Sequence, residues 1–126
     1  DTTGTPQERG MRFISTLFPD EWIQQNGRRI GEVFFRPMGN IPEEPIGKQS
    51  MAIADWKGSA DRLSDFRTPV LLLSGTEDCL VVPENSRFLC EKIPNAKLEL
   101  VQHAGHGMMF QYPELFCEKI TDFLNK

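Results

Sequence analysis

Apolar residues in the second half of the chain follow the pattern of alternating strands and helices. Residues 69–73 are continuously apolar before a Ser-Gly pair, which is typical of a parallel strand covered on both faces. Residues 97–101 alternate charged and apolar side chains and predict a second strand, less buried or nearer an edge. A helix beginning at Pro83 separates the strands, and another begins at Pro113 with apolar residues at helical spacing, namely Phe116, Ile120, Phe123 and Leu124. This order predicts an α/β fold with a right-handed βαβ unit and one further helix.

The first half of the chain has a helical pattern that breaks down toward its middle. A capping box at residues 5–8 precedes apolar residues at helical spacing, so a helix over about residues 6–17 is predicted. Residues 18–22 predict a second, short helix. The glycines and prolines over 27–47 then predict an irregular stretch with little regular structure. Helical spacing returns weakly over residues 43–56.

Composition and charge limit the class of protein. The 126 residues are 39% hydrophobic and 25% charged, which is typical of one soluble globular domain or part of one. A formal net charge of −4 without a basic stripe argues against a nucleic-acid partner. No apolar run approaches the roughly 18 residues that cross a membrane. Cys79, Cys90 and Cys117 have neither metal-ligand spacing nor an even count, so we interpret them as reduced thiols of a cytoplasmic protein.

Candidate chemistry lies in the loops that follow the two predicted strands. The first loop, residues 74–79, contains Asp78 and is called the acid loop below; the second, residues 102–107, contains His106 and is called the histidine loop. Ligands bind beyond the carboxyl ends of parallel strands, so a carboxylate and an imidazole are expected to meet at this edge. A carboxylate beside the Nδ1–H of a histidine fixes its tautomer, and the ring then serves a nucleophile as base and acid.

Neighbouring residues in the two loops offer alternatives. Asp78 taken alone could cap a turn or the next helix, which is a common role for an aspartate after a strand. His103 is a rival imidazole, but it lacks a flanking glycine and is assigned to packing or to the rim of the site. Glu77 is interpreted as a solvated neighbour of the acid, and Cys79 as a structural thiol rather than a nucleophile.

The segment 68–78 followed by 104–107 resembles the C-terminal half of the α/β-hydrolase family. In that family the acid follows the next-to-last strand in a Gly-x-x-Asp pattern, and the histidine follows a glycine after the last strand. Asp78 and His106 fill these two positions. The resemblance implies a Ser-His-Asp triad acting on an ester-like or other acyl small molecule, with Asp78 and His106 as catalytic residues. It implies no cofactor and no metal.

The resemblance also divides the chain. It is good over about residues 50–126, and it implies that residues 57–126 form the C-terminal βαβα part of the hydrolase core. Residues 1–56 are expected to form a helical, lid-like segment. Lids and hydrolase pockets are commonly apolar, so side chains from both parts are substrate-binding candidates, with ordinary core packing as the alternative. These candidates are Trp22, Phe34 and Met108.

One part of the family pattern is absent. The nucleophile elbow, Gly-x-Ser-x-Gly, does not occur in the 126 residues, so we expect the serine and its oxyanion donors to lie outside them and the fragment alone to be inactive. Two parallel strands bury little surface, and the chain is expected to pack against a missing N-terminal segment, a second chain or a copy of itself. The alternative function is a non-catalytic, truncated hydrolase module for binding or self-association. A flavodoxin-like nucleotide-binding fragment is a weaker alternative, because no glycine-rich phosphate loop is present.

Overall fold

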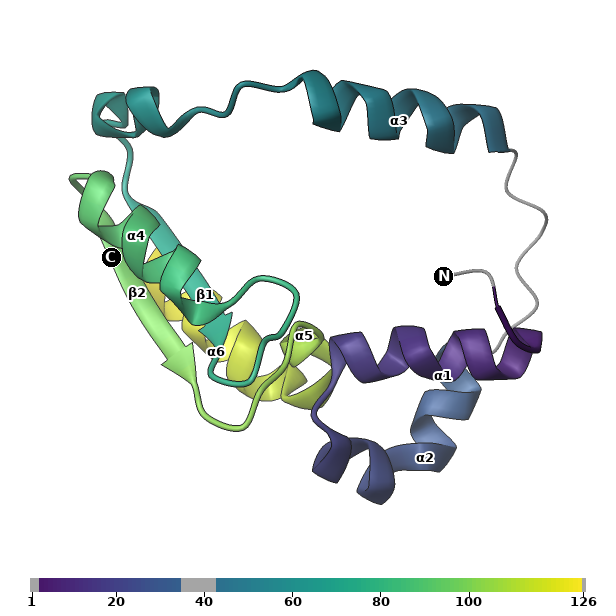
Figure 1. Cartoon of the computed structure of the whole chain (residues 1–126). Coiled ribbons are helices and arrows are strands. Elements are labelled where there is room, and N and C mark those ends of the chain that lie inside the picture. Colours follow the sequence, from purple (N-terminus) through teal and green to yellow (C-terminus); the bar gives the residue numbers. More distant parts are fainter. Residues whose placement is uncertain (1–2, 35–42, 126) are drawn as a thin grey trace.

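The computed structural model describes residues 3–34 and 43–125, which form helices and a small parallel sheet (Figure 1). The elements are α1 (Pro6–Leu17), α2 (Asp20–Phe34), α3 (Glu43–Asp55), the 3-10 helix η1 (Ala60–Asp65), β1 (Val70–Gly75), α4 (Pro83–Lys92), β2 (Ala96–Val101), α5 (Met108–Gln111) and α6 (Pro113–Leu124). Within these two ranges no helix is both long and apolar enough to cross a lipid bilayer.

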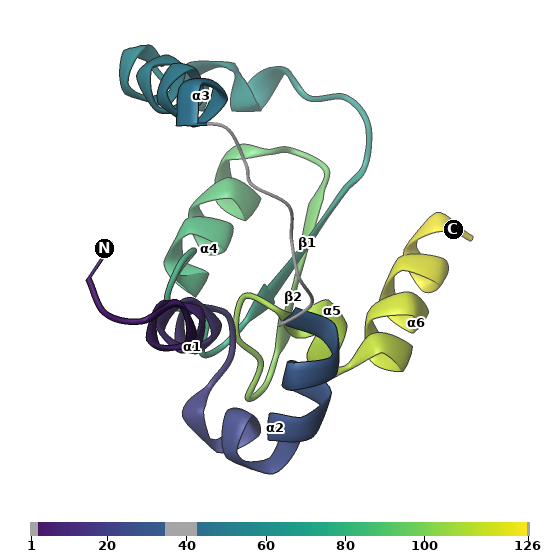
Figure 2. The same cartoon turned by 90° about the vertical axis from the view of Figure 1, so that its right-hand side faces the viewer.

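The sheet consists of β1 and β2 in parallel, as the sequence predicts. Val70 pairs with Ala96, and the register continues to Gly75 opposite Val101. Helix α4 lies on one face of the strands and α6 on the other (Figure 2). Both faces of the sheet are therefore covered, which explains the continuous apolar run in β1.

The core of this half lies where the sheet meets α5 and α6. Ala104 is fully buried beside Val101 and Met108. Four partly buried side chains pack against these three, namely Leu73, Tyr112, Leu115 and Phe116. Among the described residues the sheet has only two strands, so each strand has one unpaired edge. Independently stable sheets usually have three or more strands, and these edges favour pairing with further strands.

Helix α1 begins as its sequence predicts. The Thr5 side chain accepts a hydrogen bond from the Glu8 backbone N–H at 3.3 Å, and the Glu8 carboxylate accepts one from the Thr5 backbone N–H at 2.6 Å. The hydrogen bonds from Thr5 stabilise the ionised carboxylate and lower the pKa of Glu8. The helix predicted over residues 6–17 is confirmed, with Pro6 at its first position.

The prediction of a short helix followed by irregular structure is wrong for residues 23–34. Helix α2 continues through them, with a kink at Asn26, where φ is −122° and ψ is 20°. The side chain of Asn26 donates to the carbonyl of Trp22 at 3.0 Å. Residues 35–42 of the same predicted stretch lie outside the described residues.

Burial explains why α2 tolerates its glycines. Ile30 is only 2% exposed and packs with Ile14 and Phe18 between α1 and α2. A glycine inside a helix costs about 1 kcal/mol relative to alanine, whereas burying one large apolar side chain contributes about 1.5–3 kcal/mol. The buried face of α2 therefore offsets the cost of Gly27 and Gly31.

Helix α3 differs from every other long helix of the described structure. The weak helical spacing over residues 43–56 is confirmed as a helix, but every side chain described from residue 45 to residue 55 is exposed. Met51 and Ile53 are 68% and 67% exposed, and Trp56 beyond the helix is 66% exposed. Figures 1 and 2 show α3 standing apart from both α1–α2 and the sheet. Its apolar side chains have no covering surface among the described residues.

Candidate active site

The acid loop and the histidine loop are joined at the carboxyl edge of the sheet. Thr76 donates its backbone N–H to the carbonyl of Val101, and Glu77 donates to the carbonyl of Ala104, both at 2.9 Å. A Cβ on Gly75 would lie 2.1 Å from the Ala104 carbonyl oxygen, so this approach requires glycine. The two loops thus form one hydrogen-bonded unit.

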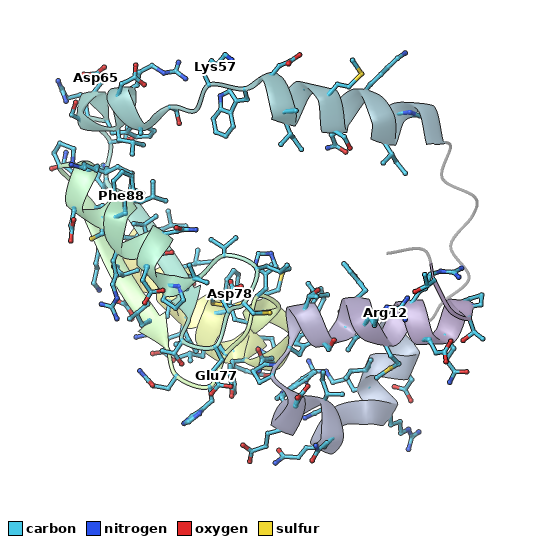
Figure 3. All side chains as sticks on the ribbon, in the orientation of Figure 1. Arg12, Lys57, Asp65, Glu77, Asp78 and Phe88 are labelled. Atoms are coloured by element: carbon cyan, nitrogen blue, oxygen red, sulfur yellow. The ribbon has the colours of Figure 1, made fainter. Side chains whose placement is uncertain are left out.

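Asp78 is the buried carboxylate of this unit. Its side chain is 6% exposed, and its Oδ1 accepts the backbone N–H groups of Leu80 and Val81 at 2.9 Å each. Its Oδ2 lies 3.0 Å from Nδ1 of His106. Figure 3 shows Asp78 in the loop between the sheet and α1. The turn-capping role and the pairing with a histidine therefore occur together, one on each carboxylate oxygen.

His106 is held at one ring nitrogen and accessible elsewhere. An ionised carboxylate only accepts hydrogen bonds, so Nδ1 of His106 is the donor to Asp78. In the neutral ring this leaves Nε2 unprotonated, with a lone pair that can take a proton. The side chain is 43% exposed, which leaves the ring open to a reacting group.

The rival imidazole has a carboxylate partner of its own. His103 Nδ1 lies 3.0 Å from Oε1 of Glu77, but these two side chains are 80% and 45% exposed. His103 adopts a left-handed backbone conformation with φ of 57°, and its N–H donates to Oγ1 of Thr76 at 3.0 Å. Exposed ion pairs contribute little, so burial of the carboxylate distinguishes the Asp78 pair from the Glu77 pair.

Both loops also bind the C-terminal end of α1. The Leu17 carbonyl accepts the backbone N–H of Gly107 at 2.8 Å, and the Thr16 carbonyl accepts Sγ–H of Cys79 at 3.4 Å. A Cβ on Gly107 would lie 2.2 Å from the ring of Phe18. Carbonyls at the end of a helix have no partner within it, and here the two loops supply the donors.

The three substrate-binding candidates lie in different surroundings. Trp22 stacks on Phe18 with ring centroids 4.6 Å apart, and Phe34 meets Phe18 edge to face at 5.6 Å. Phe34 also meets Phe110 edge to face at 5.3 Å. Met108 is 7% exposed in the core beneath the sheet. All three make the packing contacts that were the alternative interpretation, and their contact with substrate stays a prediction.

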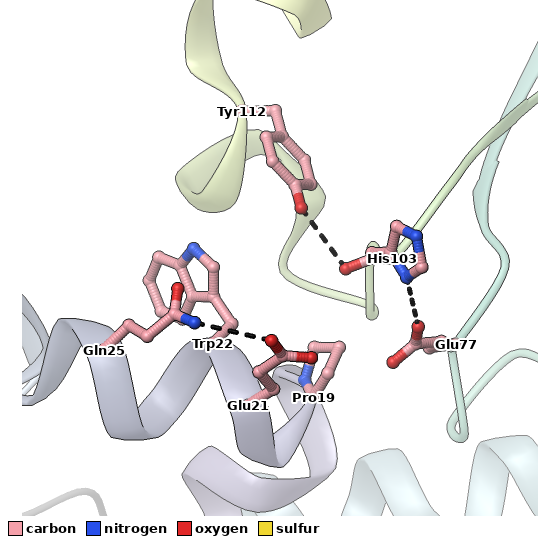
Figure 4. Close-up of a pocket in the computed structure, with 7 residues that line it drawn as sticks. All are labelled: Pro19, Glu21, Trp22, Gln25, Glu77, His103 and Tyr112. Atoms are coloured by element: carbon pink, nitrogen blue, oxygen red, sulfur yellow. Dashed lines mark hydrogen bonds and ion pairs between the residues drawn. The ribbon is translucent and has the colours of Figure 1, made fainter.

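Trp22 additionally lines an open cavity of about 310 Å³ between α2 and the histidine loop (Figure 4). His103, Glu77 and Tyr112 face it from the opposite side. Pro19, Glu21 and Gln25 complete the lining. Among residues 3–34 and 43–125, no three His, Cys, Asp or Glu side chains gather as possible metal ligands.

Sequence reasoning missed Gln111, the last residue of α5. Gln111 is 6% exposed, accepts the backbone N–H of Gly105 at 2.7 Å and donates to the carbonyl of His103 at 3.2 Å. A helix of four residues is too short to show a helical periodicity in its apolar positions. The available signal was one amide within an otherwise apolar and aromatic segment, residues 108–112.

The chain is similar to known proteins in sequence and in fold. Residues 33–113 match the family model described as alpha/beta hydrolase fold. The protein named "Putative carbamate hydrolase RutD" from Pseudomonas savastanoi is 31% identical over 110 residues, covering 86% of this chain and 42% of that protein. A proline iminopeptidase of Lactobacillus delbrueckii is 36% identical over 64 residues, covering 51% of this chain and 21% of that protein.

Two solved structures share the fold. An esterase from Thermogutta terrifontis has a TM-score of 0.78 at 22% identity, over 95% of this chain and 44% of that one. A hydrolase from Pseudomonas aeruginosa has a TM-score of 0.79 at 18% identity, over 99% of this chain and 46% of that one. The chain thus spans less than half the length of the curated relatives and solved structures it matches.

Proposed function

We propose that this chain, which belongs to the alpha/beta hydrolase fold family, supplies the acid and the base of a Ser-His-Asp triad. The complete enzyme would hydrolyse an ester-like or other acyl substrate. The serine of that triad would come from a segment or chain outside these 126 residues, which contain no Gly-x-Ser-x-Gly.

One observation carries this proposal. Oδ2 of Asp78 lies 3.0 Å from Nδ1 of His106, and the carboxylate is 6% exposed while the imidazole is 43% exposed. A buried acceptor that is also fixed by two backbone N–H groups holds the ring in one orientation. The exposed side of the ring is then available to an incoming serine.

The reaction follows from this arrangement. The serine Oγ attacks the acyl carbonyl carbon while Nε2 of His106 takes its proton, and Asp78 stabilises the imidazolium. The imidazolium then returns the proton to the leaving group, and the acyl group remains on the serine. Water attacks the acyl group in the same way, with His106 again taking and returning the proton. The oxyanion donors would accompany the serine.

The lid and the missing partner are parts of the same proposal. Residues 1–56 would act as a lid over residues 57–126, and Trp22, Phe34 and Met108 would shape the apolar side of the substrate pocket. The unpaired sheet edges and the exposed apolar side chains of α3 support association with an N-terminal segment, a second chain or a copy of this chain. The names of the relatives, a carbamate hydrolase, an esterase and an iminopeptidase, support cleavage at an acyl carbon.

The test uses protein expressed from the complete reading frame. Hydrolysis of p-nitrophenyl acetate is followed, and a fluorophosphonate probe is used to label the nucleophile. His106→Ala should lower kcat by about 10⁴-fold or more, since the base of the triad is lost. The probe should label a serine outside these 126 residues.

The matched control is His103→Ala, which removes the exposed imidazole of the same loop. It should leave turnover near the wild-type rate. Equal losses from both histidine variants, or probe labelling of a serine within this chain, would contradict the proposed roles. Association without any turnover or labelling would favour the second candidate, a non-catalytic module, which the uncovered α3 and the unpaired sheet edges also support.

A further inference from the structure

The side chain of Gln111 joins two backbone groups of the histidine loop. Its Oε1 accepts the N–H of Gly105 at 2.7 Å, and its Nε2 donates to the carbonyl of His103 at 3.2 Å. Gln111 is 6% exposed, and Gly105 is buried as well, so water does not replace these bonds readily. The hydroxyl of Tyr112 donates to the same His103 carbonyl at 3.4 Å, which is a weaker contact.

This position requires an amide. The loop offers one donor and one acceptor, and an amide side chain provides the matching acceptor and donor together. An ionised glutamate would keep the bond from Gly105 but lose the donation to His103. A methionine of similar length would lose both and leave a buried N–H without a partner, which is costly.

The bonds fix the backbone immediately before His106. Ala104 lies between the two bonded groups and accepts the N–H of Glu77, while Gly107 on the other side donates to Leu17. His106 therefore sits between two anchored segments, and Gln111 provides the anchor on its N-terminal side. Without Gln111, the loop keeps its bonds to α1, Thr76 and Glu77, but the buried N–H of Gly105, directly before His106, loses its partner.

We propose that Gln111 is a positioning residue that holds the histidine loop in the conformation from which His106 meets Asp78. The inference rests on the proposed triad. Gln111 touches no reacting atom in this scheme and acts through the backbone of residues 103–105. Catalytic groups need placement within about 0.5 Å, and a displacement of about 1 Å can cost roughly 10²-fold in rate.

The experiment compares Gln111→Met and Gln111→Glu in protein from the complete reading frame. The matched control is Gln102→Met, which makes the same change at an exposed position of the same loop. Two readouts are taken on the folded protein. One is the low-field ¹⁵N–¹H NMR signal of the His106 ring proton bound to Asp78, and the other is kcat and KM for p-nitrophenyl acetate.

Gln111→Met should broaden or shift the His106 ring-proton signal and lower kcat by roughly 10²-fold with little change in KM. Gln111→Glu should lose less, because it keeps the bond from Gly105, and Gln102→Met should match the wild type. A purely structural role would lower the unfolding midpoint while the folded fraction kept wild-type signal and kcat, and that result would overturn the proposal. Should Gln111→Met not fold, Gln111→Glu decides between the same two results.

Failure of the proposed triad is distinguishable from failure of this inference. A wild-type protein without turnover contradicts the proposed function, yet the ring-proton signal still reports whether Gln111 holds His106 against Asp78. Normal turnover with an unchanged ring-proton signal in both Gln111 variants contradicts the positioning role alone.

Discussion

The histidine loop and α3 are opposites within one chain. In the loop, Ala104 has no exposed surface, and His103, Ala104, Gly105 and Gly107 each have at least one backbone group with a hydrogen-bond partner. In α3, apolar side chains such as Ile53 are two-thirds exposed. The loop is completed by residues of this chain, whereas the apolar side chains of α3 have no cover among the described residues. The candidate active site therefore has its local support, whereas α3 does not.

The largest effect should come from Asp78→Asn. The asparagine keeps an acceptor for the backbone but no longer enforces the Nδ1–H tautomer of His106, so kcat should fall by about 10⁴-fold, as in serine-protease triads. Steady-state kinetics on protein from the complete reading frame measure this loss. A loss below tenfold would mean that the buried pair is structural.

The next effect separates the packed core between α1 and α2 from the uncovered α3 by stability. Ile14 is 1% exposed, and Ile14→Ala should lower the free energy of unfolding by about 2–5 kcal/mol through lost burial and a cavity. Ile53→Ala in α3 should change it by no more than about 0.5 kcal/mol in this 126-residue chain. Urea unfolding, monitored by circular dichroism, measures the free energy of unfolding of both variants. A much larger cost of Ile53→Ala in the complete protein would identify α3 as a covered helix there.

Two glycine-to-alanine substitutions should change the stability of the protein in opposite directions. Gly107→Ala places a Cβ 2.2 Å from the Phe18 ring and should destabilise the protein by about 1–3 kcal/mol. Gly31→Ala in α2 meets no atom within 4 Å and should stabilise it by about 0.8 kcal/mol through helix propensity. Thermal unfolding tests both variants. Equal and small shifts would show that α1 does not contact the histidine loop as described.

The smallest effect concerns the partly exposed ion pair between β2 and α6. Lys119 lies 2.8 Å from Glu99, and its hydrogen bond, followed by that of Lys97, lowers the pKa of Glu99 from its ordinary 4.5 to about 2. A lowered folded-state pKa stabilises the protein above pH 4.5, and this contribution disappears as the pH falls toward 2. Glu99→Gln should therefore flatten the dependence of Tm on pH between 4.5 and 2. An unchanged slope would show that the pair is too exposed to matter.

Much of the α/β half could be predicted because its signals are local. The apolar run at 69–73 became β1, and Pro83 and Pro113 begin α4 and α6 as predicted. The family resemblance, read from 68–78 and 104–107, is confirmed over residues 33–113. The sequence also placed Asp78 and His106 in facing loops, since parallel strands end at a common edge, and the structure brings them to 3.0 Å.

The rest depended on tertiary contacts that no local pattern records. Gly27 and Gly31 argued against a helix, but the burial of Ile30 between α1 and α2 sustains one. The pairing of Glu77 with His103 occurs at a residue in a left-handed conformation, which is rare for a residue other than glycine. Gln111 was missed because its partners are backbone groups, which every residue carries.

The C-terminal end of α1 couples the position of this helix to the acid loop and the histidine loop. Its Thr16 and Leu17 carbonyls accept hydrogen bonds from the acid loop and from the histidine loop. A rotation of α1 that breaks these bonds also removes the partners of the Cys79 thiol in the acid loop and of the Gly107 N–H in the histidine loop. Thermodynamic reciprocity then requires that a ligand favouring the aligned pair also favour the bound position of α1. Binding of such a ligand and the position of α1 would then share one equilibrium, coupled through the end of this helix.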